Sequence, residues 1–104
     1  MNPQKVQRDK VFKLEDLPNI GRSIATDLRR IGIRTPEQLI GQDPFRMYET
    51  LCEQTGVRHD PCVLDVFMSI VHFMDGGDAL TWWSFTAERK LSIRFLGITK
   101  SKVL

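Results

Sequence analysis

The sequence predicts an all-α protein: a single compact domain of five to six short helices, followed by a basic C-terminal tail. Helix-start residues recur along the chain, and glycines follow the apolar-periodic runs where helices end. No convincing alternating strand pattern precedes residue 90. A chain of 104 residues is one domain by length, and it can bury a core without disulfides or metals.

Capping residues set the expected helix boundaries. Three pairs place an N-cap residue before a proline at the first helical position, and these are Thr35-Pro36, Asp43-Pro44 and Asp60-Pro61. Thr35 and Gln38 also have capping-box spacing. Helix ends are marked by Gly32, Gly41, Gly56 and Gly76-Gly77. We therefore expect helices over residues 12–17, 22–31, 36–41, 44–55, 61–75 and 78–86.

The run over residues 61–75 is expected to be the centre of the fold, because a helix that is apolar on most sides is buried on several. Its polar residues share one narrow stripe, which we interpret as solvated: Asp65, Ser69, His72 and Asp75. Ser69, His72 and Asp75 are the residue types of a hydrolytic triad. Side chains stacked along a helix axis do not converge on one reacting atom, so we expect no catalysis there.

A tight turn, Leu17-Pro18-Asn19-Ile20-Gly21, separates two apolar-periodic runs. Asn19 and Gly21 tolerate positive φ, and the Ile20 side chain is expected to fill the seam between the helices. Ala25 is small enough to let the helices approach closely. The backbone N–H groups from Ile20 to Ser23 are then expected to face solvent at a helix N-terminus, where a phosphate binds favourably.

This stretch resembles the hairpin of the helix-hairpin-helix DNA-binding motif from Leu17 to Ile33. The motif usually has glycine at the position of Asn19 and often has lysine near Ser23. Basic residues that partly replace the lysine are Arg22, Arg29 and Arg30, opposed by Glu15, Asp16 and Asp27. The two adjacent arginines, with Arg34, also suit a helix C-terminus, where cations stabilise the helix dipole.

A second, degenerate copy follows at an offset of 37 residues. There Gly56-Val57-Arg58 corresponds to Asn19-Ile20-Gly21, with arginine in place of the second glycine. Two such units bridged by the helix over 36–41 form a double helix-hairpin-helix, as in SAM-like and DNA-polymerase-β N-terminal-like folds. The alternative is ordinary helix packing with chance matches.

From Leu14 to Arg89 the chain also resembles a small bacterial family. Its members are named for a pathogenicity locus or described as mitomycin-resistance-like helix-hairpin-helix proteins. The resemblance rests on the first hairpin and on Leu39, Asp43-Pro44, Leu51-Cys52, the stretch from Asp60 to Leu64, and Trp82-Trp83. It implies the fold and assigns no activity.

Charge divides the chain into three parts. A flexible basic N-terminus is expected over residues 1–11, the folded domain over 12–88, and a basic tail over 89–104 that is a strand or contacts a partner. The basic termini have two interpretations: they attract phosphate, or they are solvated tails without a binding role. No apolar run is long enough for a membrane span, and no secretion signal is expected. We therefore expect a cytoplasmic protein without a membrane partner.

Two further clusters invite functional interpretations. The spacing of Cys52, His59, Cys62 and His72 lacks any zinc-ligand pair, so the thiols are interpreted as small hydrophobic groups, and no cofactor or metal is expected. Trp82-Trp83 and Phe85 are expected to pack on the core; the alternatives are base stacking or contact with a partner.

The sequence favours a non-enzymatic module that binds duplex DNA through its backbone without reading sequence. The expected contact residues at the first turn are Asn19, Ile20, Gly21, Arg22, Ser23, Arg29 and Arg30. Those at the second turn are Gly56, Arg58 and His59. The alternative is a protein-interaction or homodimerisation module that keeps the hairpin only as a structural corner.

Overall fold

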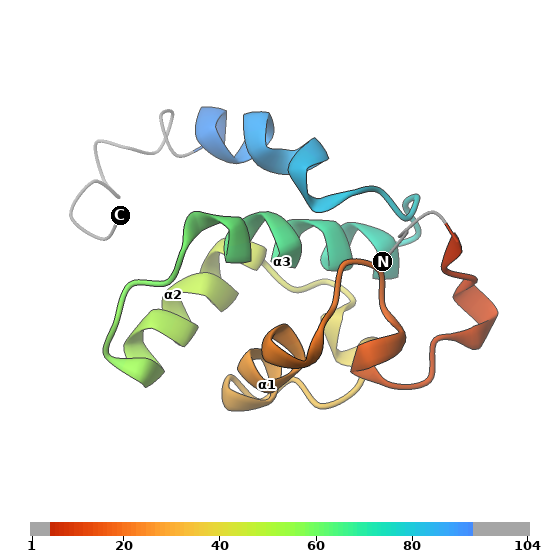
Figure 1. Cartoon of the computed structure of the whole chain (residues 1–104), viewed down its shortest axis with the longest axis horizontal. Helices are drawn as coiled ribbons and strands as arrows, with labels where there is room; N and C mark the ends of the chain where they lie inside the picture. The colour runs from red at the N-terminus through yellow and green to blue at the C-terminus, as the bar shows by residue number, and fades with distance from the viewer. Residues whose placement is uncertain (1–4, 93–104) are drawn as a thin grey trace.

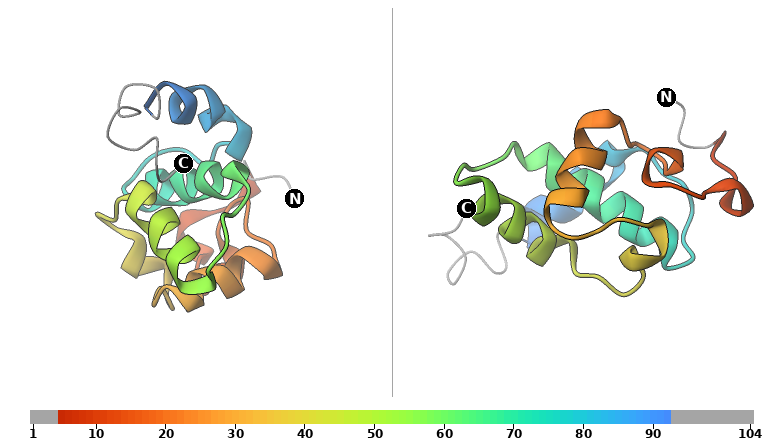
Figure 2. Two further views of the ribbon diagram at one scale, coloured as in Figure 1. Left: turned by 90° about the vertical axis from the view of Figure 1, so that its left-hand side faces the viewer. Right: turned by 90° about the horizontal axis from the view of Figure 1, so that it is seen from below.

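The longest helix, α3 (Pro61–Met74), runs through the middle of the computed structural model, which describes residues 5–92 (Figure 1). Helices α1 (Arg22–Arg30) and α2 (Pro44–Thr55) lie on one side of it, and the helical segment over residues 82–92 lies on the other (Figure 2). Most of α3 is buried from Leu64 to Phe73. The expectation of a central apolar helix is confirmed.

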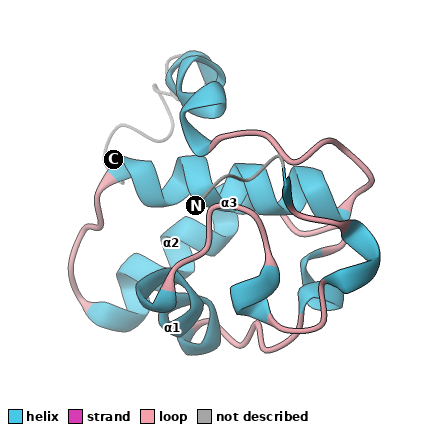
Figure 3. Cartoon of the chain, turned by 45° about the vertical axis from the view of Figure 1, so that its right-hand side comes forward, coloured by secondary structure: helices cyan, strands magenta, loops and turns pink. Residues whose placement is uncertain are grey.

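The described residues form helices and turns and contain no strand (Figure 3), so the predicted all-α class is confirmed for them. Asp43 and Asp60 cap α2 and α3, accepting hydrogen bonds from the N–H groups of Phe45 and Cys62 at 2.9 and 2.8 Å. Gly56 ends α2 in the left-handed conformation, with φ of 70°. Local capping chemistry therefore determines where both longer helices begin and where α2 ends.

Two of the expected helices are single 3-10 turns. In place of 12–17 the chain forms η3 (Leu14–Asp16), because Pro18 holds the preceding Leu17 in extended backbone. In place of 36–41 it forms η4 (Pro36–Leu39), which ends before Gly41 at φ of 77°. Gln38 still accepts a hydrogen bond from the N–H of Thr35 at 3.0 Å, as its capping-box spacing predicts.

The helix expected over 78–86 is wrong in its boundaries. Residues 78–81 are not helical, η5 (Trp82–Phe85) begins after them, and α-helix continues over 86–92. The carbonyl of Leu80 accepts a hydrogen bond from the side chain of Asn19 instead of from a helical turn. Residues 91–92 are thus helical, and the rest of the tail expected to be a strand or to contact a partner lies outside the described residues.

The N-terminal segment contacts the domain through η2 (Arg8–Lys10) and the residues around it. The Arg8 guanidinium lies 4.2 Å from the Phe73 ring centroid and donates to the carbonyls of Phe73 and Gly77. These carbonyls are at the C-terminal end of α3, where a cation is electrostatically favourable. Val11 is buried, so the described part of the expected flexible N-terminus (1–11) packs on the core.

The polar stripe of α3 is not solvated along its whole length. Asp65 and Ser69 are fully buried, whereas His72 and Asp75 are exposed. Asp65 accepts hydrogen bonds from Thr86 Oγ1 at 2.7 Å and from Arg89 Nε at 2.8 Å. Arg89, expected at the start of a tail, instead fastens the C-terminal helical segment to α3. Among the described residues, no helix has both the length and the apolar character to cross a membrane.

Candidate nucleic-acid interface

The first turn has one left-handed residue. Asn19 has φ of 65°, as expected for a residue that tolerates positive φ. Gly21 has φ of −104° and ψ of −176°, so the expectation of positive φ at this glycine is wrong. A Cβ at Gly21 meets nothing within 4 Å. The Ile20 side chain is buried in the core, as the seam-filling interpretation predicts.

The Asn19 side chain holds the turn in place. Its Nδ2 group donates to Ser69 Oγ at 3.0 Å on α3 and to the carbonyl of Leu80 at 2.8 Å. These partners are 50 and 61 residues away in the chain. Asn19 stands where the motif usually has glycine. It adopts the left-handed conformation, and its side-chain hydrogen bonds connect the turn to α3 and to the segment at Leu80.

Helix α1 begins at this turn without a side-chain cap. Gly21 is its N-cap residue, and no side-chain cap hydrogen bond forms at this helix start within the described part of the chain. The first N–H groups of an α-helix have no acceptor within the helix, so those of Arg22 and Ser23 are available to an external one. Gly21, Arg22 and Ser23 are all exposed. The three residues together form an accessible site with helix-terminal positive potential.

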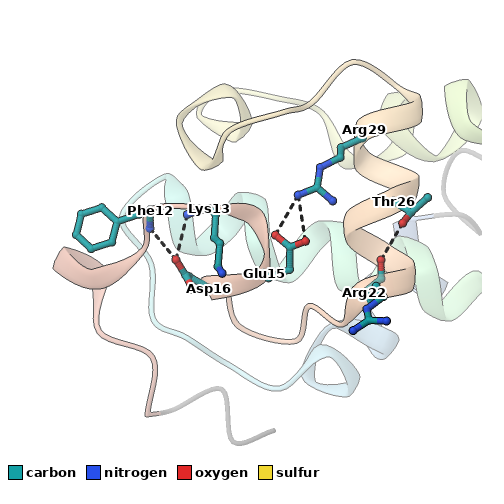
Figure 4. Close-up of polar contacts among 7 residues, drawn as sticks. All are labelled: Phe12, Lys13, Glu15, Asp16, Arg22, Thr26 and Arg29. Atoms are coloured by element: carbon teal, nitrogen blue, oxygen red, sulfur yellow. Dashed lines mark hydrogen bonds and ion pairs between the residues drawn. The ribbon is translucent and has the colours of Figure 1, made fainter.

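The two arginines expected to assist lie elsewhere. Arg29 is seven positions beyond Arg22, about 10 Å along the helix axis (Figure 4). Its Nη2 group contacts both carboxylate oxygens of Glu15 at 3.0 Å. Arg30 lies 3.7 Å from Asp27. The structure therefore brings Gly21, Arg22 and Ser23 together and separates Arg29 and Arg30 from them.

Figure 4 also shows the polar contacts around η3 and the start of α1. Thr26 Oγ1 donates to the carbonyl of Arg22 at 3.0 Å, within α1. A backbone hydrogen bond and the Arg29 guanidinium lower the pKa of Glu15. No ion-pair partner of the Arg22 guanidinium occurs between residues 5 and 92. Of the three acids expected to oppose the hairpin charge, Glu15 is paired with Arg29, and the Arg22 guanidinium is left to solvent or a ligand.

The second turn, between α2 and α3, has a related backbone but a different surface. Gly56 is left-handed like Asn19, at the position 37 residues later. Val57 is 57% exposed, whereas Ile20 at the matching position of the first turn is buried. His59 Nε2 and Thr55 Oγ1 form a 2.8 Å hydrogen bond, and the His59 carbonyl accepts from the Tyr48 hydroxyl. Gly56, Arg58 and His59 lie together, with the imidazole engaged inside the turn.

A carboxylate already occupies the helix terminus at this second turn. Asp60 caps α3, and its hydrogen bond from the N–H of Cys62 lowers the pKa of its carboxyl group. A negative side chain at this position repels a phosphate and uses a donor that the phosphate needs. The two turns therefore differ in chemistry, because the first has an open helix terminus and the second has one occupied by its own acid.

The cysteines and the polar residues of α3 take part in packing and hydrogen bonds. No group of three or more His, Cys, Asp or Glu side chains within the described residues could hold a metal. Cys52 and Cys62 are half-buried free thiols, and the hydrogen bond with Asp60 raises the pKa of Cys62. Ser69 donates to the carbonyl of Val66, while the His72 ring packs edge-on against Phe85.

Comparison with known proteins places the chain in a family. Residues 7–91 match the model of the family described as "Pathogenicity locus" (Cdd1), and the chain belongs to that family. It is also similar to the mitomycin resistance protein McrB of Streptomyces lavendulae, with 46% identity over 77 residues. That match covers 74% of this chain and 73% of the relative. No solved structure matches the chain significantly.

Proposed function

We propose that this protein is a non-enzymatic module that binds the backbone of duplex DNA through the first turn, without reading sequence. The observation that carries the proposal is the uncapped, exposed N-terminus of α1 at Gly21, Arg22 and Ser23. A phosphate there accepts hydrogen bonds from backbone N–H groups and is attracted by the helix dipole and by the Arg22 guanidinium. Phosphate contacts of this kind do not discriminate between base sequences.

We further propose that the two turns are the halves of a double helix-hairpin-helix. The left-handed residues Asn19 and Gly56 support this assignment, because they occupy matching positions 37 residues apart. Leu14 and Leu51, which match under the same offset, are both fully buried. Gly56, Arg58 and His59 are the proposed second contact. The Asp60 cap makes this contact the weaker of the two, so the first turn supplies most of the affinity.

Charge reversal at the first turn tests the proposal. Gly21→Glu introduces no steric strain, because a Cβ at this extended position meets no atom within 4 Å. We expect Gly21→Glu and Arg22→Glu each to weaken duplex binding about tenfold or more at low salt, measured by fluorescence anisotropy. The neutral variant Gly21→Gln is the matched control for size, and we expect it to bind more tightly than Gly21→Glu.

A second control separates local contact from overall charge. Arg46 lies in the first turn of α2, about 14 Å along the helix from the second turn, and is exposed. Arg46→Glu changes the net charge as much as Arg22→Glu, and we expect a much smaller loss of binding. Equal losses for the two variants, or duplex binding by Arg22→Glu as tight as that of the wild type, contradict the proposed site.

A protein-interaction module is the second candidate, and one observation favours it. Trp83 is 60% exposed and Leu91 is 65% exposed, on the same helical segment. Trp82 packs on the core and meets Trp83 edge to face, with ring centroids 5.5 Å apart. Large apolar side chains on a surface often mark contacts with a partner. Sedimentation at increasing concentration tests for a homodimer, and loss of association in Trp83→Ala supports this function.

A further inference from the structure

Phe12 is the most exposed large apolar side chain of the described residues, at 78%. Its ring points outward from the turn that precedes η3, away from the body of the domain (Figure 4). Within residues 5–92, Phe12 belongs neither to the core nor to a ring contact. A ring this exposed is accessible to a ligand.

The backbone on either side of Phe12 is held by buried neighbours and by hydrogen bonds. Val11 directly before it is buried, and Leu14 two positions after it is fully buried. The N–H groups of Phe12 and Lys13 both donate to Asp16 Oδ2 at 3.1 Å. These two hydrogen bonds also lower the pKa of Asp16. Phe12 is displayed by a preorganised turn.

The surroundings of Phe12 are basic. Exposed lysines flank it in the segment 5–13, and these are Lys5, Lys10 and Lys13. The opposing acids are Asp9 and Asp16, and the Asp16 carboxylate accepts a hydrogen bond from the N–H of Phe12 itself. With Arg8 counted, the cations around Phe12 are still in excess. The exposed apolar residues near the other end of the chain are Trp83 and Leu91. Glu88 and Lys90 lie beside them and Arg89 is paired with Asp65, so the described residues there carry no such excess. An exposed aromatic ring among cations suits a nucleobase with its phosphates better than an apolar protein surface.

We propose that Phe12 stacks on an unpaired base of DNA that has a single-stranded segment next to a duplex. This inference rests on the proposed function, in which the first turn holds the duplex. Nine residues separate Phe12 from Gly21, so their Cα atoms are at most about 30 Å apart. A duplex rises about 3.4 Å per base pair, so a DNA molecule of about nine base pairs is long enough to span both features. The class of ligand is therefore an overhang, gap or bulge.

Two DNA probes separate stacking from duplex binding: a short blunt duplex, and the same duplex with a single-stranded overhang. We expect the wild type to prefer the overhang probe, and Phe12→Ala to bind that probe about tenfold more weakly while binding the blunt duplex unchanged. Phe12→Trp retains the preference, because tryptophan also stacks. Ile40→Ala is the matched control, since Ile40 is a comparably exposed apolar residue elsewhere, and we expect no change from it.

The outcomes distinguish this inference from the proposed function. If the wild type binds both probes equally and Arg22→Glu still weakens the blunt duplex, stacking is excluded and the first-turn site stands. If neither probe is bound, both proposals fail. Equal losses of both probes in Phe12→Ala overturn stacking, as does a loss of self-association in that variant by sedimentation. An unchanged melting temperature in Phe12→Ala confirms that the variant folds.

Discussion

Arg89→Met should strongly destabilise the fold, because it leaves the carboxylate of Asp65 buried without its cation. Asp65 is fully buried, and the Arg89 side chain is only 12% exposed. Arg89 donates at 2.8 and 3.3 Å, and Thr86 Oγ1 donates at 2.7 Å. Methionine keeps the aliphatic length and helix propensity of arginine but removes both of its hydrogen bonds.

The expected cost is about 3–5 kcal/mol, the usual penalty for removing one partner of a buried ion pair. A small domain is stable by about 5–15 kcal/mol, so this loss is a large fraction of the total. It corresponds to a fall in melting temperature of more than about 12 °C for a domain of this size. The double variant Asp65→Asn with Arg89→Met leaves no buried charge, so it should recover part of the loss.

Urea unfolding followed by circular dichroism measures these differences as shifts in the midpoint. Lys90→Met is the matched control, because Lys90 is the exposed neighbouring cation, and its cost should stay below about 0.5 kcal/mol. A cost below about 1 kcal/mol for Arg89→Met would refute the inference that this ion pair fastens residues 82–92 to α3. A double variant no more stable than Arg89→Met would show that uncompensated charge is not the cause.

Two further predictions concern the turns. Asn19→Ala should be less stable than Asn19→Gly by about 1 kcal/mol by thermal unfolding, because both lose the hydrogen bonds to Ser69 and Leu80 but only alanine is strained at φ of 65°; the opposite order would contradict the left-handed assignment. The folded-state pKa of Asp60 is lowered by its hydrogen bond from the N–H of Cys62, so its stabilisation is present above the ordinary carboxyl pKa and is lost as pH falls through the folded value. Asp60→Asn keeps a capping oxygen but does not titrate, so its stability should fall less than that of the wild type below about pH 4; parallel acid-unfolding curves for the two proteins would exclude this contribution.

Features encoded within a few residues were predictable from the sequence. The caps Asp43 and Asp60, the helix end at Gly56 and the left-handed Asn19 all follow from neighbouring residues, and the structure confirms each of them. The central burial of α3 follows from its apolar periodicity. The exposed residues at the start of α1 were predictable for the same reason, because they are neighbours in the sequence.

Features that depend on contacts between distant residues were not predictable from spacing alone. Asn19 bonds to Ser69 and Leu80 only after the chain folds, and no local pattern indicates these partners. Arg89 looks like the first residue of a basic tail until α3 is seen to bury Asp65 beside it. Whether the polar stripe of α3 is solvated or paired within the protein depends on which segment packs over it.

The same reasoning explains the candidate site. Gly21, Arg22 and Ser23 are adjacent in sequence, so their joint presence at the N-terminus of α1 was predictable. The engagement of Arg29 with Glu15 depends on how η3 packs against α1, a tertiary contact. The backbone of the Asn19 turn depends on one left-handed residue rather than on two.

Backbone amide chemical shifts are the most direct test of phosphate binding at the first turn. In a two-dimensional 15N–1H NMR titration with a short blunt duplex, the amides of Arg22 and Ser23 should shift most among residues 5–92. The amide of Cys62, already bonded to Asp60, should shift much less. These shifts should diminish steeply as salt is raised, because phosphate binding releases counterions. Unchanged amides at Arg22 and Ser23 in DNA-bound protein would contradict the central claim.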